Sequence, residues 1–202
     1  MELKIVLIGG FVEIIELCQE LDYQEIYVID RADVGRGTVF LGTDESIRET
    51  IHEIVETEFI ITADMPRIRE KIYKFYSKHN ITYSSLISSN TRISATSQIG
   101  RGTVIQYGSF VSTDVVIGSF VKLNVNVCVF HDSVIGDFTT LAPSCNILGR
   151  VIIGKYCYIG TSGTILPNLS ICDNVTIGAG AVVTKNITQP GVYTGVPAVK
   201  IK

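Results

Sequence analysis

The chain has 202 residues, of which 46% are hydrophobic and 18% are charged, and its formal net charge at pH 7 is −3. This length allows one or two domains, and the mean hydropathy of +0.34 is high for a soluble protein. The weak negative charge excludes a basic surface for nucleic acid, and no apolar run is long enough to be inserted into a membrane.

The first 82 residues alternate compact apolar segments with segments of helical spacing. The apolar segments predict strands over Lys4–Ile8, Glu25–Ile29, Val39–Leu41 and Glu58–Thr62. The helical spacing predicts helices over Val12–Leu21, Asp44–Val55 and Pro66–His79. Either Asp44 or Thr43 caps the second of these helices. Alternating strands and helices predict a parallel sheet with helices on both faces.

Ligands of such sheets bind at the carboxyl ends of the strands. Here these ends carry Gly9 and Gly10 after the first strand and Asp30 after the second. Asp30 follows the glycines at the distance where a dinucleotide fold places its ribose-binding acid, but the GxGxxG pattern of NAD-binding folds is absent. Two interpretations stay open, a structural turn with a surface Asp and a shallower nucleotide pocket.

From Ile87 to Val183, every sixth residue is Ile, Leu or Val. A period of six fits neither an α-helix nor a simple strand alternation and indicates a parallel β-helix built from hexapeptides. The stretch 84–96 is the junction into this solenoid. The series comprises Ile87, Ile93, Ile99, Ile105, Val111, Ile117, Leu123, Val129, Ile135, Leu141, Ile147, Ile153, Ile159, Ile165, Ile171, Ile177 and Val183.

Two further positions of the repeat are restricted. Four residues after each aliphatic, the side chain is small or β-branched, with Leu169 as the large exception, so both positions are predicted to point inward. The residue directly after the aliphatic is often glycine, which we interpret as a corner that needs unusual backbone angles. These glycines are Gly100, Gly118, Gly136, Gly154, Gly160 and Gly178.

The five cysteines have no CxxC spacing, and Cys145 and Cys157 occupy the small inward position. We therefore expect buried, reduced thiols in a cytoplasmic protein and no metal site. Glu13 soon interrupts the apolar start of the chain, so no signal peptide is expected. Of the three histidines, His52 and His79 lie in predicted helices as surface or packing residues. His131 lies in the solenoid, at an outward position.

The whole chain resembles the sialic-acid O-acetyltransferase-type sugar acyltransferases, and among them the bacterial nucleotide-linked 4-amino-sugar N-acetyltransferases. The resemblance rests on the order of the two parts, on the hexapeptide repeat, and on the ending Ala179–Lys185 followed by Gly195–Ala198. It implies a small Rossmann-like α/β domain that binds a nucleotide sugar, residues 1–82, and a left-handed parallel β-helix with a C-terminal tail, residues 83–202. The hand of the coil comes from the resemblance alone.

The resemblance also implies roles for residues on the solenoid surface. His131 is the general base that takes a proton from the attacking amine or hydroxyl, a step for which imidazole is well matched at neutral pH. Asp132 orients the ring of His131, or else is a solvated turn residue. Asn124 contacts the sugar near the reacting amine, or else stacks along the solenoid corner. Thr140 departs from the family, because some members carry a second histidine there.

Acetyl-CoA is the implied acyl donor, held by backbone amides in the cleft between two prisms of a homotrimer. No metal is needed, since a backbone amide can polarise the carbonyl. The resemblance assigns seven positions to the binding of acetyl-CoA. For most of them the alternative interpretation is a glycine needed at a corner or an alanine needed in the core. The positions are Gly149, Gly160, Thr161, Ala179, Ala181, Lys185 and Pro197.

These expectations favour an acetyl-CoA-dependent N-acetyltransferase that acts on a UDP-, dTDP- or GDP-linked 4-amino-4,6-dideoxy sugar in bacterial surface glycan synthesis. O-Acetylation of a sugar or a sialic acid is the alternative. A solenoid zinc carbonic anhydrase would need three histidine ligands, whereas the solenoid offers only His131. A non-catalytic solenoid for binding or assembly is disfavoured by His131–Asp132 and by the ending Gly195–Ala198.

Overall fold

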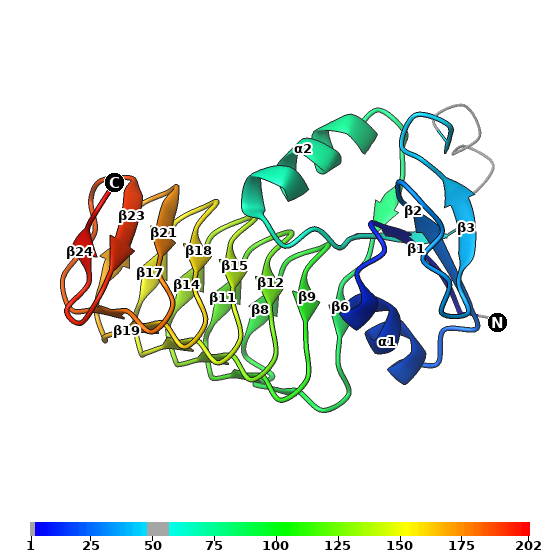
Figure 1. Ribbon diagram of the computed structural model, residues 1–202. Helices are drawn as coiled ribbons and strands as arrows, with labels where there is room; N and C mark the ends of the chain where they lie inside the picture. The colour runs from blue at the N-terminus through cyan, green and yellow to red at the C-terminus, as the bar shows by residue number, and fades with distance from the viewer. Residues whose placement is uncertain (1–2, 48–56) are drawn as a thin grey trace.

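A computed structural model describes residues 3–47 and 57–202, in which an α/β unit is followed by a long solenoid (Figure 1). Most of the predicted helix Asp44–Val55, together with His52, lies outside the described residues. Within the described part of the chain, no helix combines the length and the apolar character that crossing a membrane requires.

The α/β unit contains one five-stranded parallel sheet with the strand order β3-β2-β1-β4-β5. Its strands are β1 (Lys4–Ile8), β2 (Glu25–Ile29), β3 (Val39–Gly42), β4 (Glu58–Ile61) and β5 (Thr82–Tyr83). Its helices are α1 (Val12–Glu20) and α2 (Pro66–Tyr76). The four predicted strands are present, and the short strand β5 is an addition.

The two helices cover opposite faces of this sheet (Figure 1). Successive residues of a strand point to opposite sides, and β1 follows this rule. Ile5 and Leu7 belong to the apolar cluster that contains Ile14 of α1. Val6 and Ile8 belong to the cluster that contains Tyr76 of α2. The predicted parallel sheet with a helix on each face is therefore present.

The segment after β3 begins with a capped turn. The Ser46 amide donates to Thr43 Oγ1 at 3.3 Å, and the Thr43 amide donates to Ser46 Oγ at 2.9 Å. Such a reciprocal pair satisfies amides that have no partner at the start of a helical turn. Asp44 instead accepts a hydrogen bond from the Tyr76 hydroxyl at 2.5 Å. Thr43 therefore caps this turn, and the helix that either residue was predicted to cap lies mostly outside the described residues.

The solenoid is a triangular prism whose three faces are sheets of short strands (Figure 1). Face 1 contains β6 (Leu86–Ile87), β9 (Val104–Ile105), β12 (Lys122–Leu123), β15 (Thr140–Leu141), β18 (Tyr158–Ile159), β21 (Val175–Ile177), β23 (Gly191–Thr194) and β24 (Val199–Lys200). Face 2 contains β7 (Arg92–Ile93), β10 (Phe110–Val111), β13 (Cys128–Val129), β16 (Asn146–Ile147), β19 (Thr164–Ile165) and β22 (Val182–Val183). Face 3 contains β8 (Gln98–Ile99), β11 (Val116–Ile117), β14 (Val134–Ile135), β17 (Ile152–Ile153) and β20 (Ser170–Ile171).

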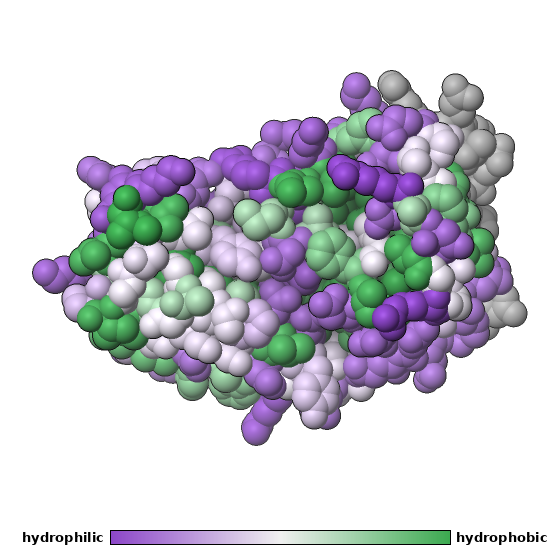
Figure 2. Space-filling view, in the orientation of Figure 1, coloured by the Kyte–Doolittle hydropathy of each residue, from purple (hydrophilic) through white to green (hydrophobic). Residues whose placement is uncertain are grey.

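Each coil stacks on the next in parallel register, so that Leu123 lies opposite Leu141. All series residues from Ile105 to Val183 are buried in one continuous core. Ile87 and its two successors are only partly buried, because the first coil has no coil on its outer side. At the other end the antiparallel strand β24 closes the prism. This end exposes apolar side chains, among them Val196 and Val199 (Figure 2).

The cysteines largely follow the prediction. All five are free, and Cys18, Cys145 and Cys157 are buried, whereas Cys128 and Cys172 are half-buried. Burial raises the pKa of the Cys145 thiol to about 12 and that of the Cys157 thiol to about 11. These thiols are therefore protonated and unreactive at neutral pH.

The interpretation of the glycines that follow the aliphatic residues is wrong. Positive φ angles occur three residues after the aliphatic, as at Asp114 with 57° and Asn126 with 57°. The glycines are needed for space instead: a Cβ atom on Gly100 would lie 2.5 Å from the carbonyl carbon of Gly118 on the next coil. A side chain there would push neighbouring coils apart.

Helix α2 is fastened to the corner between faces 3 and 1. Phe120, Phe138 and Tyr156 stack there with ring centroids 5.0 and 5.6 Å apart. The buried guanidinium of Arg69 donates to the carbonyl oxygens of Phe120 at 2.7 Å, Phe138 at 2.9 Å and Ala63 at 2.6 Å. Burial lowers the pKa of Arg69 to about 10, which leaves it charged at neutral pH. These bonds position the loop after β4 against the solenoid.

Candidate active site

His131 lies at the corner between faces 2 and 3, two residues after β13. Its Nδ1 atom is 2.8 Å from Asp132 Oδ2, so the predicted contact between neighbouring residues is present. Asp132 has a φ of 58°, and this left-handed conformation turns its side chain toward the ring instead of the opposite side. The two side chains are 45% and 53% exposed, and the pair therefore faces solvent.

The contact with Asp132 decides which ring nitrogen of His131 is free. A carboxylate only accepts hydrogen bonds, so Nδ1 carries the hydrogen and Nε2 is left as an acceptor. Gly149, one coil further along the same corner, lies directly against this ring. A Cβ atom at Gly149 would stand 2.6 Å from Nε2 and 2.8 Å from Cε1. Only glycine leaves room for the ring in this position.

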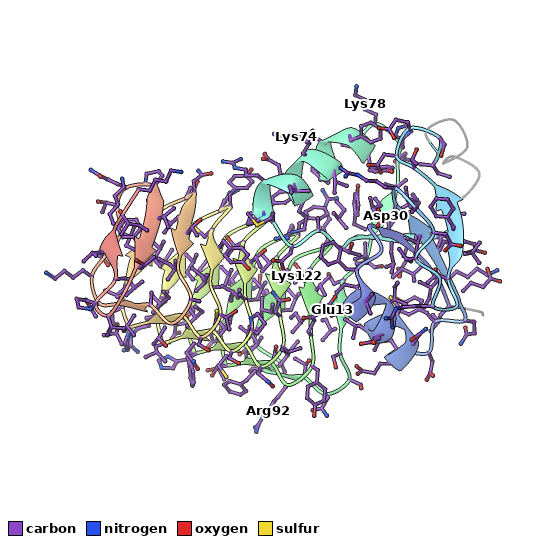
Figure 3. The ribbon with its side chains drawn as sticks, in the orientation of Figure 1. Glu13, Asp30, Lys74, Lys78, Arg92 and Lys122 are labelled. Carbon is purple, nitrogen blue, oxygen red and sulfur yellow. The ribbon has the colours of Figure 1, made fainter. Side chains whose placement is uncertain are left out.

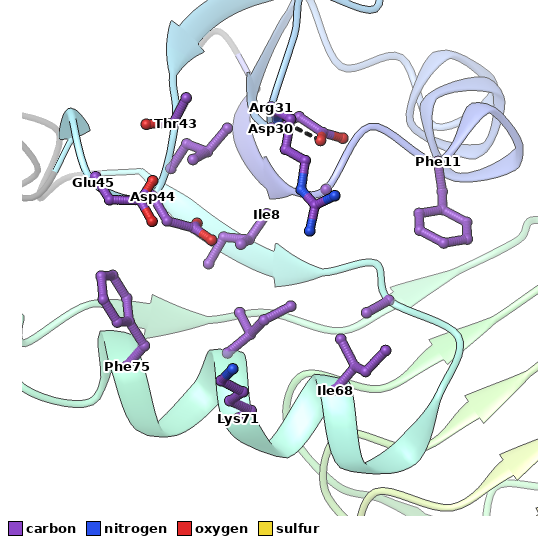
Figure 4. Close-up of a pocket in the computed structure, with 14 residues that line it drawn as sticks. Ile8, Phe11, Asp30, Arg31, Thr43, Asp44, Glu45, Ile68, Lys71 and Phe75 are labelled. Atoms are coloured by element: carbon purple, nitrogen blue, oxygen red, sulfur yellow. Dashed lines mark hydrogen bonds between the residues drawn. The ribbon is translucent and has the colours of Figure 1, made fainter.

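A second candidate region is a cleft of about 690 Å³ at the carboxyl ends of the sheet strands (Figure 4). Gly9 and Asp30 line it, as the position after β1 and β2 predicts. The Gly10 amide donates to Asp30 Oδ2 at 2.6 Å, and the Arg31 amide donates to Oδ1 at 2.6 Å. Asp30 therefore ties two loops together, as the structural interpretation predicts, and it also borders the cleft.

Both glycines of the first loop are required by space. A Cβ atom on Gly9 would lie 2.4 Å from Thr62 Oγ1, and one on Gly10 would lie 2.4 Å from Val34. Gly9 in addition has a φ of 102°, a conformation that side chains disfavour. The two glycines thus let the backbone after β1 pass close to Thr62 and Val34.

Sequence reasoning missed a polar cluster between the cleft and the solenoid. Asp64 follows β4, and its Oδ1 atom lies 3.3 Å from the ammonium of Lys122 on face 1. Lys122 is buried, and burial lowers its pKa. Its ammonium also lies 5.1 Å from the centre of the Phe11 ring, where α1 meets the solenoid (Figure 3). Lys122 occupies an outward position of the repeat, so only the docking of the α/β unit buries it.

Asn124 and Thr140 belong to the same region. The Asn124 amide donates to the Leu141 carbonyl of the next coil at 3.1 Å and lies 3.5 Å from Asp64 Oδ1. This geometry fits the interpretation of Asn124 as a side chain that stacks along the corner. Thr140 is buried and donates to the Asp64 carbonyl at 2.6 Å. Its hydroxyl stabilises the junction of the two units.

Most of the residues predicted to hold the acyl donor lie at two different corners of the prism. Gly149 lies at the corner of His131, and Lys185 follows further along that corner. Gly160, Thr161 and Ala179 lie at the corner between faces 1 and 2, as does Asn124. The two corners border face 2, so one chain does not bring His131 together with the second group. Pro197 lies exposed in the C-terminal tail.

Ala181, the remaining position predicted to hold the acyl donor, lies inside the prism. Its side chain is fully buried in the core of the prism. Its amide donates to the Gly178 carbonyl at 3.2 Å, and its carbonyl accepts from the Thr164 amide at 2.9 Å. Both backbone groups are thus engaged within the solenoid. The cause is that Ala181 occupies the small inward position of the repeat.

No cluster of three or more His, Cys, Asp or Glu side chains in residues 3–47 and 57–202 has an arrangement that could hold a metal ion.

Comparisons with solved structures find several proteins of the same fold. The acetyltransferase domain of PglB from Neisseria gonorrhoeae, in complex with acetyl coenzyme A, matches with a TM-score of 0.92 and 25% identity over 100% of both chains. PerB from Caulobacter crescentus, in complex with CoA and GDP-perosamine, matches with a TM-score of 0.92 and 22% identity over 98% of this chain and 97% of that chain. WeeI from Acinetobacter baumannii matches with a TM-score of 0.85 and 24% identity over 98% of this chain and 99% of that chain.

No protein-family model and no curated protein sequence matches the chain. The PglB domain, at 25% identity, nevertheless confirms the predicted resemblance to acetyltransferases, and PerB and WeeI, which are less similar in sequence, share the fold. They extend over almost the whole chain and thus include the α/β unit as well as the solenoid. The likeness supports the prediction of an acyltransferase that uses acetyl-CoA.

Proposed function

We propose that this chain is an acetyl-CoA-dependent N-acetyltransferase that acetylates a nucleotide-linked 4-amino-4,6-dideoxy sugar for bacterial surface glycan synthesis. Residues 1–82 form a Rossmann-like domain that binds the UDP-, dTDP- or GDP-linked sugar, and residues 83–202 form a left-handed β-helix that carries the catalytic base. The observation that carries this proposal is the His131–Asp132 pair on a solenoid, with Nε2 of the ring left as an acceptor.

The geometry of the pair fits a general base. His131 Nε2 accepts the proton that the sugar amine loses as the amine attacks, and Asp132 stabilises the imidazolium that forms. The imidazolium then returns the proton to the departing thiolate, so that the ring is ready for the next turnover. Acetyl-CoA supplies the thioester carbonyl that is attacked. A base of this kind contributes roughly 10²- to 10⁴-fold to the rate.

We further propose that the protein acts as a cytoplasmic homotrimer. His131 lies at one border of face 2, and Asn124, Gly160 and Thr161 lie at the other. If three prisms turn face 2 toward a common axis, the His131 corner of one subunit meets the opposite corner of its neighbour. Each interface then contains a complete site for the donor and the amine. A stable monomer with full activity in light scattering would contradict this arrangement.

The nucleotide is proposed to bind in the cleft beside Gly9, Gly10 and Asp30. A cleft of about 690 Å³ lies within the range of ordinary ligand pockets, and its place at the carboxyl ends of parallel strands is the usual one for nucleotides. In the neighbour PerB, the ligands are CoA and a GDP-linked sugar. The cleft and the solenoid of this chain offer one region for each.

The test is a CoA-release assay over a panel of UDP-, dTDP- and GDP-linked amino sugars, with free sialic acids as a comparison. We expect release with a nucleotide-linked 4-amino sugar. His131→Ala should lower kcat by roughly 10²- to 10⁴-fold and leave the oligomeric state unchanged, whereas His79→Ala, outside the site, should retain activity. Release with sialic acids alone would favour the O-acetyltransferase, and turnover retained by His131→Ala would exclude this base.

A further inference from the structure

Two cationic side chains reach into the middle of the cleft from opposite walls. Arg31 extends from the end of β2, and Lys71 extends from α2 toward it (Figure 4). Among the described residues, neither the guanidinium of Arg31 nor the ammonium of Lys71 has a hydrogen-bond or ion-pair partner. By contrast, Lys74 on the same helix is paired with Glu70 at 2.7 Å. Two unpaired cations that face one cleft make a site for an anion.

The cleft is chemically ordered along its length (Figure 4). At one end lie the carboxylates of Asp44 and Glu45 and the Phe75 ring, which is 38% exposed. Arg31 and Lys71 occupy the middle. At the other end, Phe11 leads to the cluster of Lys122 and Asp64 on the solenoid side. A ligand that fills this cleft therefore contacts the Phe75 ring and the two carboxylates at one end and the two cations in the middle. Its other end points toward the solenoid, where acetyl transfer is proposed to occur.

Among the described residues, the carboxylates around the cleft do not form ion pairs with the two cations. Both oxygens of Asp30 already accept backbone amides at 2.6 Å. Asp44 accepts a hydrogen bond from the Tyr76 hydroxyl, and Glu45 lies at the far end beside it. Phosphate oxygens at that end would be repelled, whereas the amide and amino groups of a base would find acceptors. The charge distribution thus selects the middle of the cleft for phosphate.

We propose that Arg31 and Lys71 clamp the diphosphate of the nucleotide sugar, with the base against Phe75 and the sugar directed past Phe11 to the solenoid. This inference rests on the proposed function and adds the direction in which the substrate lies. An arginine fork and a lysine ammonium are complementary in this role, because the first binds two oxygens and the second acts as a point charge. An exposed aromatic ring suits any base, because every base has a stacking face.

The experiment compares the affinity of nucleoside monophosphates and diphosphates for the full-length protein. UMP, UDP, dTMP, dTDP, GMP and GDP are titrated by calorimetry into the wild type and into Arg31→Gln, Lys71→Gln and Phe75→Ala. The wild type should bind at least one diphosphate, and bind it more tightly than its monophosphate. Each glutamine variant should weaken the diphosphate at least about tenfold, remove most of the preference over the monophosphate, and reduce the dependence on salt.

Phe75→Ala serves as the contrasting variant. It should weaken monophosphate and diphosphate by a similar factor, about fivefold or more, and keep the preference between them. Arg92→Gln and Lys78→Gln are matched controls, because these cations lie away from the cleft (Figure 3). They should bind all six nucleotides as the wild type does. Thermal melting of each variant checks that the exposed substitutions leave the fold intact.

Two results would overturn the clamp. One is a diphosphate preference that survives in both glutamine variants, and the other is a wild type that binds none of UDP, dTDP and GDP at millimolar concentration. Acetyl transfer is measured separately by CoA release. If the wild type turns over but Arg31→Gln and Lys71→Gln keep its KM, the clamp is wrong and the proposed function stands. If the clamp is confirmed but no amino sugar releases CoA, the proposed function is wrong.

Discussion

The replacement Gly149→Ala is a stringent test of how the site is built. Gly149 is not among the residues with positive φ, so alanine causes no backbone strain there. Its new Cβ atom would, however, lie 2.6 Å from Nε2 and 2.8 Å from Cε1 of His131. Because ordinary contacts begin near 3.4 Å, the ring must move by roughly 1 Å. A methyl group one coil away thereby displaces the proposed base.

The expected loss follows from this displacement. A misplacement of about 1 Å in a catalytic group can lower the rate about 10²-fold, and we expect a fall of that order in kcat. The free energy of unfolding should change by only about 1 kcal/mol or less, because the half-exposed ring can rotate outward instead of straining the core. Binding in the nucleotide cleft should be unaffected, since the cleft lies in the α/β unit.

The assay measures kcat by CoA release for the wild type, Gly149→Ala, His131→Ala and the double variant. If Gly149 acts through the ring of His131, its substitution costs nothing further once that ring is absent. The double variant should therefore equal His131→Ala. A Gly149→Ala enzyme with the kcat of the wild type, or full additivity in the double variant, would refute the argument.

Two more predictions concern stability. Arg69→Met removes the hydrogen bonds that tie α2 to the solenoid and leaves buried carbonyls without a partner. The free energy of unfolding, measured by urea denaturation, should therefore fall by about 3 kcal/mol or more. The control Arg92→Met, at an exposed position, should show little change. The Glu70 carboxyl beside Lys74 and Arg67 has its pKa lowered from 4.5 to about 2, so its stabilising effect is complete above 4.5 and is lost as the pH falls toward 2. Glu70→Gln should thus be less stable than the wild type by about 1 kcal/mol at pH 7 and by progressively less below pH 4.5, and a difference independent of pH would contradict this assignment.

The glycines of the repeat are restricted for a reason that only the folded structure shows. Their position after the aliphatic residue is visible in the sequence, but its reason is not. Gly100 and its equivalents avoid the backbone of the next coil, and the left-handed residues are Asp114, Asn126 and others three positions after the aliphatic. A repeat shows which positions are restricted, whereas the stacking of coils decides whether space or backbone angle restricts them.

The candidate site likewise combines residues that the sequence indicates with contacts that only the fold creates. His131 stands out in the sequence as the histidine at an outward solenoid position, and Asp132 as its neighbour. Gly149, which leaves room for the ring of His131, lies 18 positions further along the chain, and only the stacking of coils brings the two residues into contact. Lys122 and Asp64 meet across 58 residues, and Arg31 and Lys71 face each other across 40. No local pattern encodes these pairs.

By itself, the sequence determined which residues face the core, because a side chain's direction along a strand or a coil depends on a short period in the chain. It likewise determined the order of an α/β unit and a solenoid, and the outward position of His131. The tertiary structure decided what those outward residues meet. The docking of α2 through Arg69 buries Lys122 against Asp64 and places the cleft beside the prism, since such contacts depend on how two finished surfaces fit together.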